Sequence, residues 1–197
     1  VTGALLLTLS LASSAQSSPP APTVDKSDPS GLPSEIEPRA VQSLLLDAVQ
    51  TASGFVVAGE RGHVLTSSDG VKWEQQKVPT RSTLTAIATA DGQLWAAGHD
   101  GVIVHSADGG QTWQIQRSDP FMPVPGQDPA DRDQRQGAPV LDLLFADATH
   151  GIAVGAYSLM LQTSDGGATW TPVQALAGSN TTAAAEPQAV ASESGVF

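Results

Sequence analysis

The amino-acid sequence predicts an all-β protein, a β-propeller built from four-stranded antiparallel blades. Two observations lead to this fold class: one segment repeats three times along the chain, and each copy ends in a turn rich in Ser, Asp and Gly that precedes a Trp. The copies are FVVAGERGHVLTSSDGVKW, LWAAGHDGVIVHSADGGQTW and GIAVGAYSLMLQTSDGGATW, at 55–73, 94–113 and 151–170. Units of about forty residues with four short strands are typical of propeller blades or of solenoid coils.

The motif Ser/Thr-x-Asp-Gly-Gly-x-Thr-Trp favours the propeller. SADGGQTW and TSDGGATW match the Asp-box of BNR-repeat propellers, while SSDGVKW is one residue shorter and lacks the Thr. We expect the Asp and hydroxyl side chains to hydrogen-bond the backbone of their own turn and each Trp to cover a neighbouring strand. The alternative is a catalytic role for the three aspartates. The folding interpretation assigns to these turns Ser67, Asp69, Trp73, Ser106, Asp108, Trp113, Thr163, Asp165 and Trp170.

The strands follow from apolar runs separated by turn residues. First strands are predicted at 44–49, 84–89 and 140–145, and second strands at 55–58, 94–97 and 152–154. Third strands are predicted at 63–66, 102–105 and 159–162, and a fourth strand starts at each Trp. A helix over 38–50, capped by Ser34 and Glu37, is the competing interpretation, but the alignment of this segment with 84 and 140 favours a strand from about 43.

The propeller is predicted over 43–197, with blades at about 43–79, 83–118 and 139–176. The last ten residues, QAVASESGVF, repeat DAVQTASGF at 47–55, so an incomplete fourth blade is predicted at 187–197. Three blades and the start of a fourth cannot close a ring, so we expect the propeller to be a fragment. Residues 1–15 are predicted as a signal peptide without its charged n-region, which indicates export to the periplasm. Residues 16–42, rich in Ser, Pro and Ala, are predicted as a flexible linker.

Composition excludes several classes of function. Nine basic against twenty acidic residues give a net charge of −11, which disfavours binding to nucleic acids or to anionic membranes. The absence of Cys excludes disulfides and thiolate sites. The four histidines, at 63, 99, 105 and 150, lack the spacing of metal ligands, so we expect neither a metal nor another cofactor, and no membrane insertion once the signal peptide is removed.

The second hairpin turn of each blade is the candidate binding surface. In a four-stranded meander this turn lies on the face opposite the Asp-box, which is the third turn. The second turns are GERG, GHDG and GAYS, with ionisable or aromatic residues where a tight turn needs only Gly and small polar ones. The alternative is that these residues are polar only because the tips of turns are exposed to water. A long insertion at 118–138 is expected on the same face. The candidate partner-binding residues are Glu60, Arg61, His99, Asp100 and Tyr157, with Asp47 and Asp142 at the start of inner strands and Thr85 close to the equivalent place.

SLLLDAV, AGERGHVLTSSDG and LTAIATADGQLWAAGHDGVIVHSADGGQTW, with AVGAYSLMLQTSDGGATW, resemble the photosystem II stability/assembly factor-like propellers over 43–176. The resemblance implies a non-enzymatic assembly scaffold, in the thylakoid lumen of a phototroph or in the bacterial periplasm. It implies a protein partner from a membrane complex, either photosystem-like or an RND-type exporter. The arginine-rich patch of the photosynthetic members has no clear counterpart here.

A sialidase-like glycoside hydrolase is the alternative function, because sialidases also use Asp-box propellers. Such enzymes need an arginine cluster and a Tyr nucleophile beside a Glu. The only tyrosine, Tyr157, lies in a turn without a neighbouring Glu, so we expect no catalytic residues in this chain.

Overall fold

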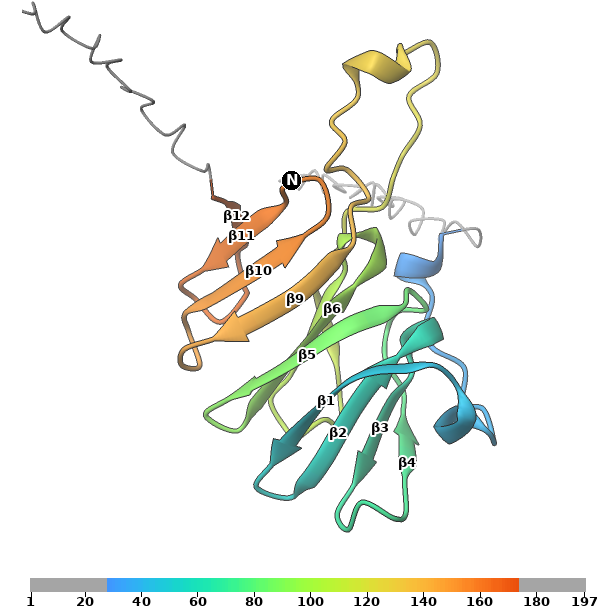
Figure 1. The fold of residues 1–197 in the computed structure, drawn as a ribbon, viewed down its shortest axis with the longest axis vertical. Helices are drawn as coiled ribbons and strands as arrows, with labels where there is room; N and C mark the ends of the chain where they lie inside the picture. The colour runs from blue at the N-terminus through green and yellow to red at the C-terminus, as the bar shows by residue number, and fades with distance from the viewer. Residues whose placement is uncertain (1–27, 174–197) are drawn as a thin grey trace, which may run out of the picture.

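The computed structural model describes residues 28–173, which form three four-stranded antiparallel sheets (Figure 1). In each sheet the strands lie in chain order, as predicted for propeller blades. Blade 1 contains β1 (Leu45–Thr51), β2 (Gly54–Gly59), β3 (Val64–Ser67) and β4 (Glu74–Gln76). Blade 2 contains β5 (Leu84–Ala90), β6 (Gln93–Gly98), β7 (Ile103–Ser106) and β8 (Gln114–Arg117). Blade 3 contains β9 (Val140–Phe145), β10 (Gly151–Gly155), β11 (Met160–Thr163) and β12 (Thr171–Pro172).

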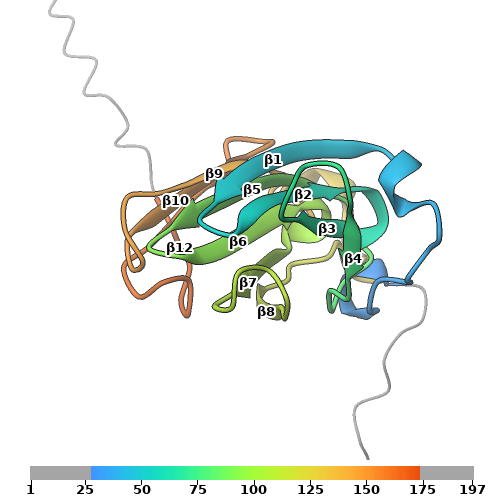
Figure 2. The ribbon, with the colours of Figure 1, turned by 90° about the horizontal axis from the view of Figure 1, so that it is seen from below.

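The first strands of the three blades lie side by side. Strand β5 contacts both β1 and β9, and Figures 1 and 2 show the blades fanning out from these inner strands. The segment for which a helix competed with a strand is a strand from Leu45, preceded by the single 3-10 turn η2 (Ala40–Gln42). Among the described residues no helix has the length and hydrophobicity of a membrane span.

Apolar side chains fill two seams, which hold the blades together. The first seam lies between blades 1 and 2 and buries Val56 and Ala58 with Ile87, Leu94 and Val104. The second seam lies between blades 2 and 3, where Trp95 stacks on Phe145 with the ring centroids 3.6 Å apart. Blade 2 is covered on both faces because alternate residues of its strands point into the two seams. This explains why residues 94–97 of β6 form a continuous apolar run.

A bulge near the start of each inner strand sets the polar contacts between blades. The register of β1, β5 and β9 against their neighbours skips Leu46, Thr85 and Leu141. Asp47 therefore aligns with Ala86 and Asp142, and Thr85 lies one position before Ala86, close to the equivalent place. Asp47 Oδ2 accepts a hydrogen bond from the Ile87 amide of blade 2 at 2.8 Å. In the second seam the Thr85 hydroxyl donates to the Val140 carbonyl instead.

Residues 28–42, called here the N-terminal segment, differ from the flexible linker predicted for 16–42. The segment lies along the connection between blades 1 and 2, where the Ser34 amide donates to the Val78 carbonyl at 2.7 Å and the Val78 amide donates to Ser34 Oγ at 2.9 Å. Two ion pairs, Glu35–Arg81 and Glu37–Arg61, flank this pairing. The segment is thus part of the folded unit, starting with the 3-10 turn η1 (Pro29–Gly31).

Three sequence predictions fall outside the described residues. These are the signal peptide at 1–15, the linker residues 16–27 and the fourth-blade residues 187–197.

Candidate functional site

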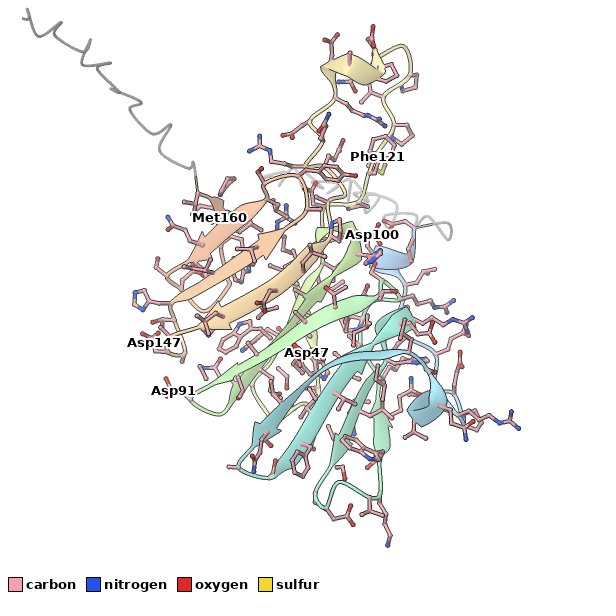
Figure 3. All side chains as sticks on the ribbon, viewed as in Figure 1. Asp47, Asp91, Asp100, Phe121, Asp147 and Met160 are labelled. Atoms are coloured by element: carbon pink, nitrogen blue, oxygen red, sulfur yellow. The ribbon has the colours of Figure 1, made fainter. Side chains whose placement is uncertain are left out.

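The turns β2–β3, β6–β7 and β10–β11 and the insertion 118–138 occupy one face, called here the second-turn face. Figure 3 labels Asp100 and Phe121 on this side of the molecule, while Asp91 and Asp147 lie at the opposite ends of the blades. The predicted split of the turns between two faces is therefore present in the structure. The Asp-box turns lie with Asp91 and Asp147 on the other face, as their position after the third strands requires.

A close approach of the backbone fixes each second turn against the inner strand of its blade. The amides of Glu60, His99 and Ala156 donate to the carbonyls of Leu44, Thr83 and Pro139 at 2.9, 2.9 and 3.1 Å. The preceding residue is Gly in all three blades. A Cβ on Gly98 would lie 1.9 Å from the Thr83 carbonyl oxygen, so only Gly fits this contact. The repeated Gly of the sequence is thus explained by packing.

The middle residue of each second turn has a left-handed backbone, a feature that the sequence did not reveal. Arg61, Asp100 and Tyr157 have φ values of 54°, 56° and 55°. Asp tolerates this region better than most residues, whereas a bulky side chain such as Tyr is disfavoured there. In blades 1 and 2 a Gly follows, but in blade 3 Ser158 follows with φ 59°. The turn of blade 3 therefore contains two consecutive strained residues, and such strain is often found at binding sites.

Five of the seven candidate partner-binding residues make structural contacts. Glu60 Oε1 accepts from the Leu44 amide, Arg61 pairs with Glu37, and Asp100 Oδ2 accepts from Ser82 Oγ at 2.6 Å. Asp47 and Asp142 accept from the backbone of their own inner strands. His99 and Tyr157 remain exposed, and among the described residues neither side chain has a hydrogen-bonding partner. The second-turn face thus has fewer available groups than the sequence suggested.

The insertion is attached firmly at its base. Arg117 donates to the Gly101 carbonyl at 2.6 Å and pairs with Asp119 at 2.8 Å. The Asp119 amide donates to the Asp100 carbonyl at 2.9 Å, so the insertion starts from the second turn of blade 2. Its tip, with the 3-10 turn η5 (Pro129–Asp131), stands away from the blades in Figures 1 and 3, and residues 121–135 are exposed.

A cavity of about 450 Å³ lies between the insertion and blade 3. Its walls include Phe121, Arg132 and Gln136 from the insertion and Tyr157 from the second turn of blade 3. The Arg132 guanidinium lies 4.8 Å above the centre of the Phe121 ring. Aromatic rings beside a guanidinium are groups that bind apolar and anionic parts of a protein partner.

The Asp-box carboxylates are engaged by their own turns. Asp108 Oδ1 accepts from the amides of Gln111 and Thr112, and the Thr112 hydroxyl donates to Oδ2. The hydroxyl and amide of Thr112 lower the pKa of Asp108 to about 2, and those of Thr169 lower the pKa of Asp165 to about 2. In the shorter first box the amide of Lys72 is the main cause of the lowered pKa of Asp69. These contacts support the folding role.

Burial of the Asp-box tryptophans differs between blades. Trp113 is buried in the first seam and donates to the Gly110 carbonyl at 2.8 Å. Trp73 and Trp170 are only half-buried. Trp73 lies on the outer face of blade 1, in a small cluster with Val57 and Leu65 of the same blade and Ala40 of the N-terminal segment. Trp95, outside the Asp-box series, is fully buried and donates to the Gly166 carbonyl.

Residues 28–173 contain no group of three His, Cys, Asp or Glu side chains arranged to hold a metal ion.

Comparison with known proteins adds to this geometry. Residues 35–130 match the family model described as photosynthesis system II assembly factor YCF48. No curated protein matches the chain. A solved structure, YCF48 bound to D1 peptide, is similar with a TM-score of 0.51 and 16% identity, covering 66% of this chain and 40% of that chain. YCF48 from Cyanidioschyzon merolae gives a TM-score of 0.49 and 21% identity, covering 66% and 37%. The chain therefore spans about two fifths of the length of the solved structures that it matches.

Proposed function

Because this chain belongs, over residues 35–130, to the photosystem II assembly factor-like family of BNR β-propellers, we propose that it is a non-catalytic scaffold. Its partner is a peptide segment of a membrane protein complex, held while that complex is assembled or stabilised. The structure with a similar fold that contains a D1 peptide supports a peptide partner of this class. The apolar run and small residues at 1–15 support export, to the periplasm or to a thylakoid lumen.

The location of the site rests on the position of Tyr157, which lines the cavity between the insertion and blade 3. Its side chain is 63% exposed, and its backbone has the disfavoured left-handed conformation. Exposed aromatic side chains are the usual anchors of protein interfaces. Folding does not require a Tyr here, since the equivalent turn positions hold Arg61 and Asp100 and a Gly would relieve the strain. The engagement of the Asp-box carboxylates within their own turns supports the non-catalytic part of the proposal.

The test replaces Tyr157 by Gly. A Gly accepts the left-handed conformation without strain, so the melting temperature should stay the same or rise, while capture of the partner should fall by about tenfold, the typical loss at an interface anchor. Photo-crosslinking from position 157 should identify the partner as a membrane protein. Gln111→Gly, an exposed change on the Asp-box face, is the control and should leave capture unchanged. Normal capture by Tyr157→Gly would show that the partner binds elsewhere.

A further inference from the structure

His63 is a buried polar residue without a hydrogen-bonding partner. Its side chain is 1% exposed, and neither Nδ1 nor Nε2 forms a hydrogen bond to any described residue. Buried polar groups in proteins are almost always hydrogen-bonded, because burying one without a partner is costly. The ring of His63 is therefore a hydrogen-bonding group that the described part of the chain does not use.

Folding does not require a His at this position. His63 directly precedes the third strand of blade 1, and its carbonyl accepts from the second-turn Gly of that blade, as the carbonyls of Val102 and Leu159 do in blades 2 and 3. Val102 and Leu159 are apolar and lie buried in the first and second seams. His63 is two residues from Leu65 and shares its face, where Leu65 packs beside Ala40 of the N-terminal segment. An apolar side chain would therefore meet the packing needs of this position.

His63 forms the inner wall of a pocket of about 200 Å³ between blade 1 and the N-terminal segment. The other walls are two ion pairs. Glu37 contacts Arg61 at 3.1 Å, and Glu35 contacts Arg81 at 2.8 Å. The volume is that of about six water molecules, enough for a small ligand. Both ion pairs are partly exposed, and exposed pairs open at little cost, so such a ligand can reach the ring of His63.

The charges around the pocket select among classes of ligand. A simple anion would lie close to both carboxylates, and a simple cation would lie close to both guanidiniums, which is unfavourable in each case. A metal ion is a poor fit, because residues 28–173 contain no group of three His, Cys, Asp or Glu side chains arranged to hold one. A small molecule that carries a carboxylate beside an ammonium matches both signs of charge at once.

We propose that this pocket binds a small zwitterion of the α-amino acid class. Its carboxylate binds the guanidiniums of Arg61 and Arg81 together with an N–H of the His63 ring. Its ammonium binds the carboxylates of Glu35 and Glu37. Hydrogen bonds between charged groups are stronger than those between neutral ones. The pocket shares no lining residue with the cavity between the insertion and blade 3, so this site is independent of the proposed partner site.

Glycine, the smallest α-amino acid, is the probe for the full 197-residue chain. Titration to about 10 mM, ten times the Kd of a weak millimolar site, should shift the ring nitrogen NMR signals of His63. The signals of His99, His105 and His150 should not move. Acetate and methylammonium carry one charge each, so calorimetry should show that each binds at least about tenfold more weakly than glycine.

His63→Val gives blade 1 the residue that blade 2 has at this position. The affinity for glycine should fall at least about tenfold, while the melting temperature stays the same or rises because a buried unpaired polar group is removed. Glu35→Gln and Arg61→Gln, at the exposed rim, should each lower the affinity about tenfold and leave the fold intact. Glu74→Gln and Arg135→Gln lie outside the pocket and are the matched controls, which should bind glycine as the wild type does.

The absence of a His63 shift over this titration would overturn the proposal. Equal affinity for glycine and acetate would identify a simple anion site and would overturn it as well. Undiminished binding of glycine by His63→Val would show that the ligand sits elsewhere. If His63→Val fails to fold, Glu35→Gln and Arg61→Gln decide the question, because unchanged affinity in both would exclude the pocket.

Discussion

At the scale of single residues, the Asp-box aspartates show how a carboxylate can organise a turn. Asp108 and Asp165 each accept hydrogen bonds from amides and from a Thr hydroxyl within their own turn, and their pKa falls to about 2 in consequence. The turn is therefore stabilised by the ionised carboxylate. Protonation removes acceptor capacity and weakens the turn.

This charge dependence predicts an acid-sensitive stability. The folded-state pKa of Asp108 and Asp165 lies below the unfolded value of about 3.9, so their contribution is complete above about pH 4 and is lost as the pH falls toward 2. Asp108→Asn should lower the melting temperature at pH 7 and flatten its decline between about pH 4 and pH 2. Melts at several pH values for the wild type and for Asp128→Asn, an exposed aspartate of the insertion, provide the comparison. An equally steep decline in Asp108→Asn would show that the charge of Asp108 does not stabilise its turn.

The Asp-box contacts could be predicted from the sequence because hydroxyl, carboxylate and Gly stand at fixed spacing within one turn. The left-handed conformation of Arg61 and Tyr157 could not, because neither residue type signals it. The contacts of Glu60 and Asp100 were missed for a different reason. Their partners, Leu44 and Ser82, lie 16 and 18 residues away, and local spacing does not show which turn meets which strand.

At the scale of the elements, each second turn is seated on the inner strand through a Gly. Gly98 has an extended backbone, with φ −178°, which any residue can adopt. Gly is therefore required at this position only because a Cβ would have no room. The oxygen that a Cβ would meet belongs to the backbone at Thr83, which cannot move without shifting the start of β5.

Gly98→Ala should therefore destabilise the protein by about 1–3 kcal/mol, the usual cost of overpacking. Gly31→Ala is the matched control, because a Cβ there meets no atom within 4 Å, and its melting temperature should not change measurably. Thermal melts of both variants would measure the difference. Equal melting temperatures would mean that the turn moves freely against β5.

The elements themselves were largely predictable. Alternating and continuous apolar runs gave the strands of all three blades, and the third strands differ from the prediction by one residue, as in β3 at Val64–Ser67 against 63–66. The bulges were not predictable, since Leu46, Thr85 and Leu141 do not resemble one another. Because of the bulge in β5, Ala86 occupies the position of Asp47, and Thr85 lies beside it.

At the scale of the whole molecule, stability is distributed over seams between neighbouring blades. Phe145 is central to the second seam, where it stacks on Trp95 and meets the edge of Trp170 at 5.9 Å. In architectures built from repeated units, each unit is stabilised mainly by its neighbours.

Phe145→Ala should cost about 3–5 kcal/mol, with the loss concentrated in blade 3. Native-state hydrogen exchange should show amides of β9 to β11 losing more protection than those of β1 to β3. Phe121→Ala removes an exposed Phe of the insertion and should leave all three blades unaffected. A uniform loss over every blade in Phe145→Ala would indicate one cooperative unit.

Composition could not predict how the N-terminal segment joins this assembly. Its Ser, Pro and Ala residues are typical of linkers, yet it pairs with the chain after β4 mostly through backbone groups and short hydroxyl side chains. Such hydrogen bonds depend on how the two backbones fit together, and they leave no hydrophobic pattern in the sequence. The segment buries Ser30, Ser34 and Ala40, and two of these three side chains are hydroxyls.

The contact between Ser118 Oγ and Ser30 Oγ, at 3.0 Å, has a consequence for the time course of folding during synthesis. Residue 30 leaves the ribosome long before residue 118, and at about 5–20 residues per second the delay is on the order of ten seconds. The segment can pair with Val78 earlier, but its first turn has no Ser118 partner until blade 2 has been synthesised. The part of the described chain that is made first is thus the part whose contacts are completed late.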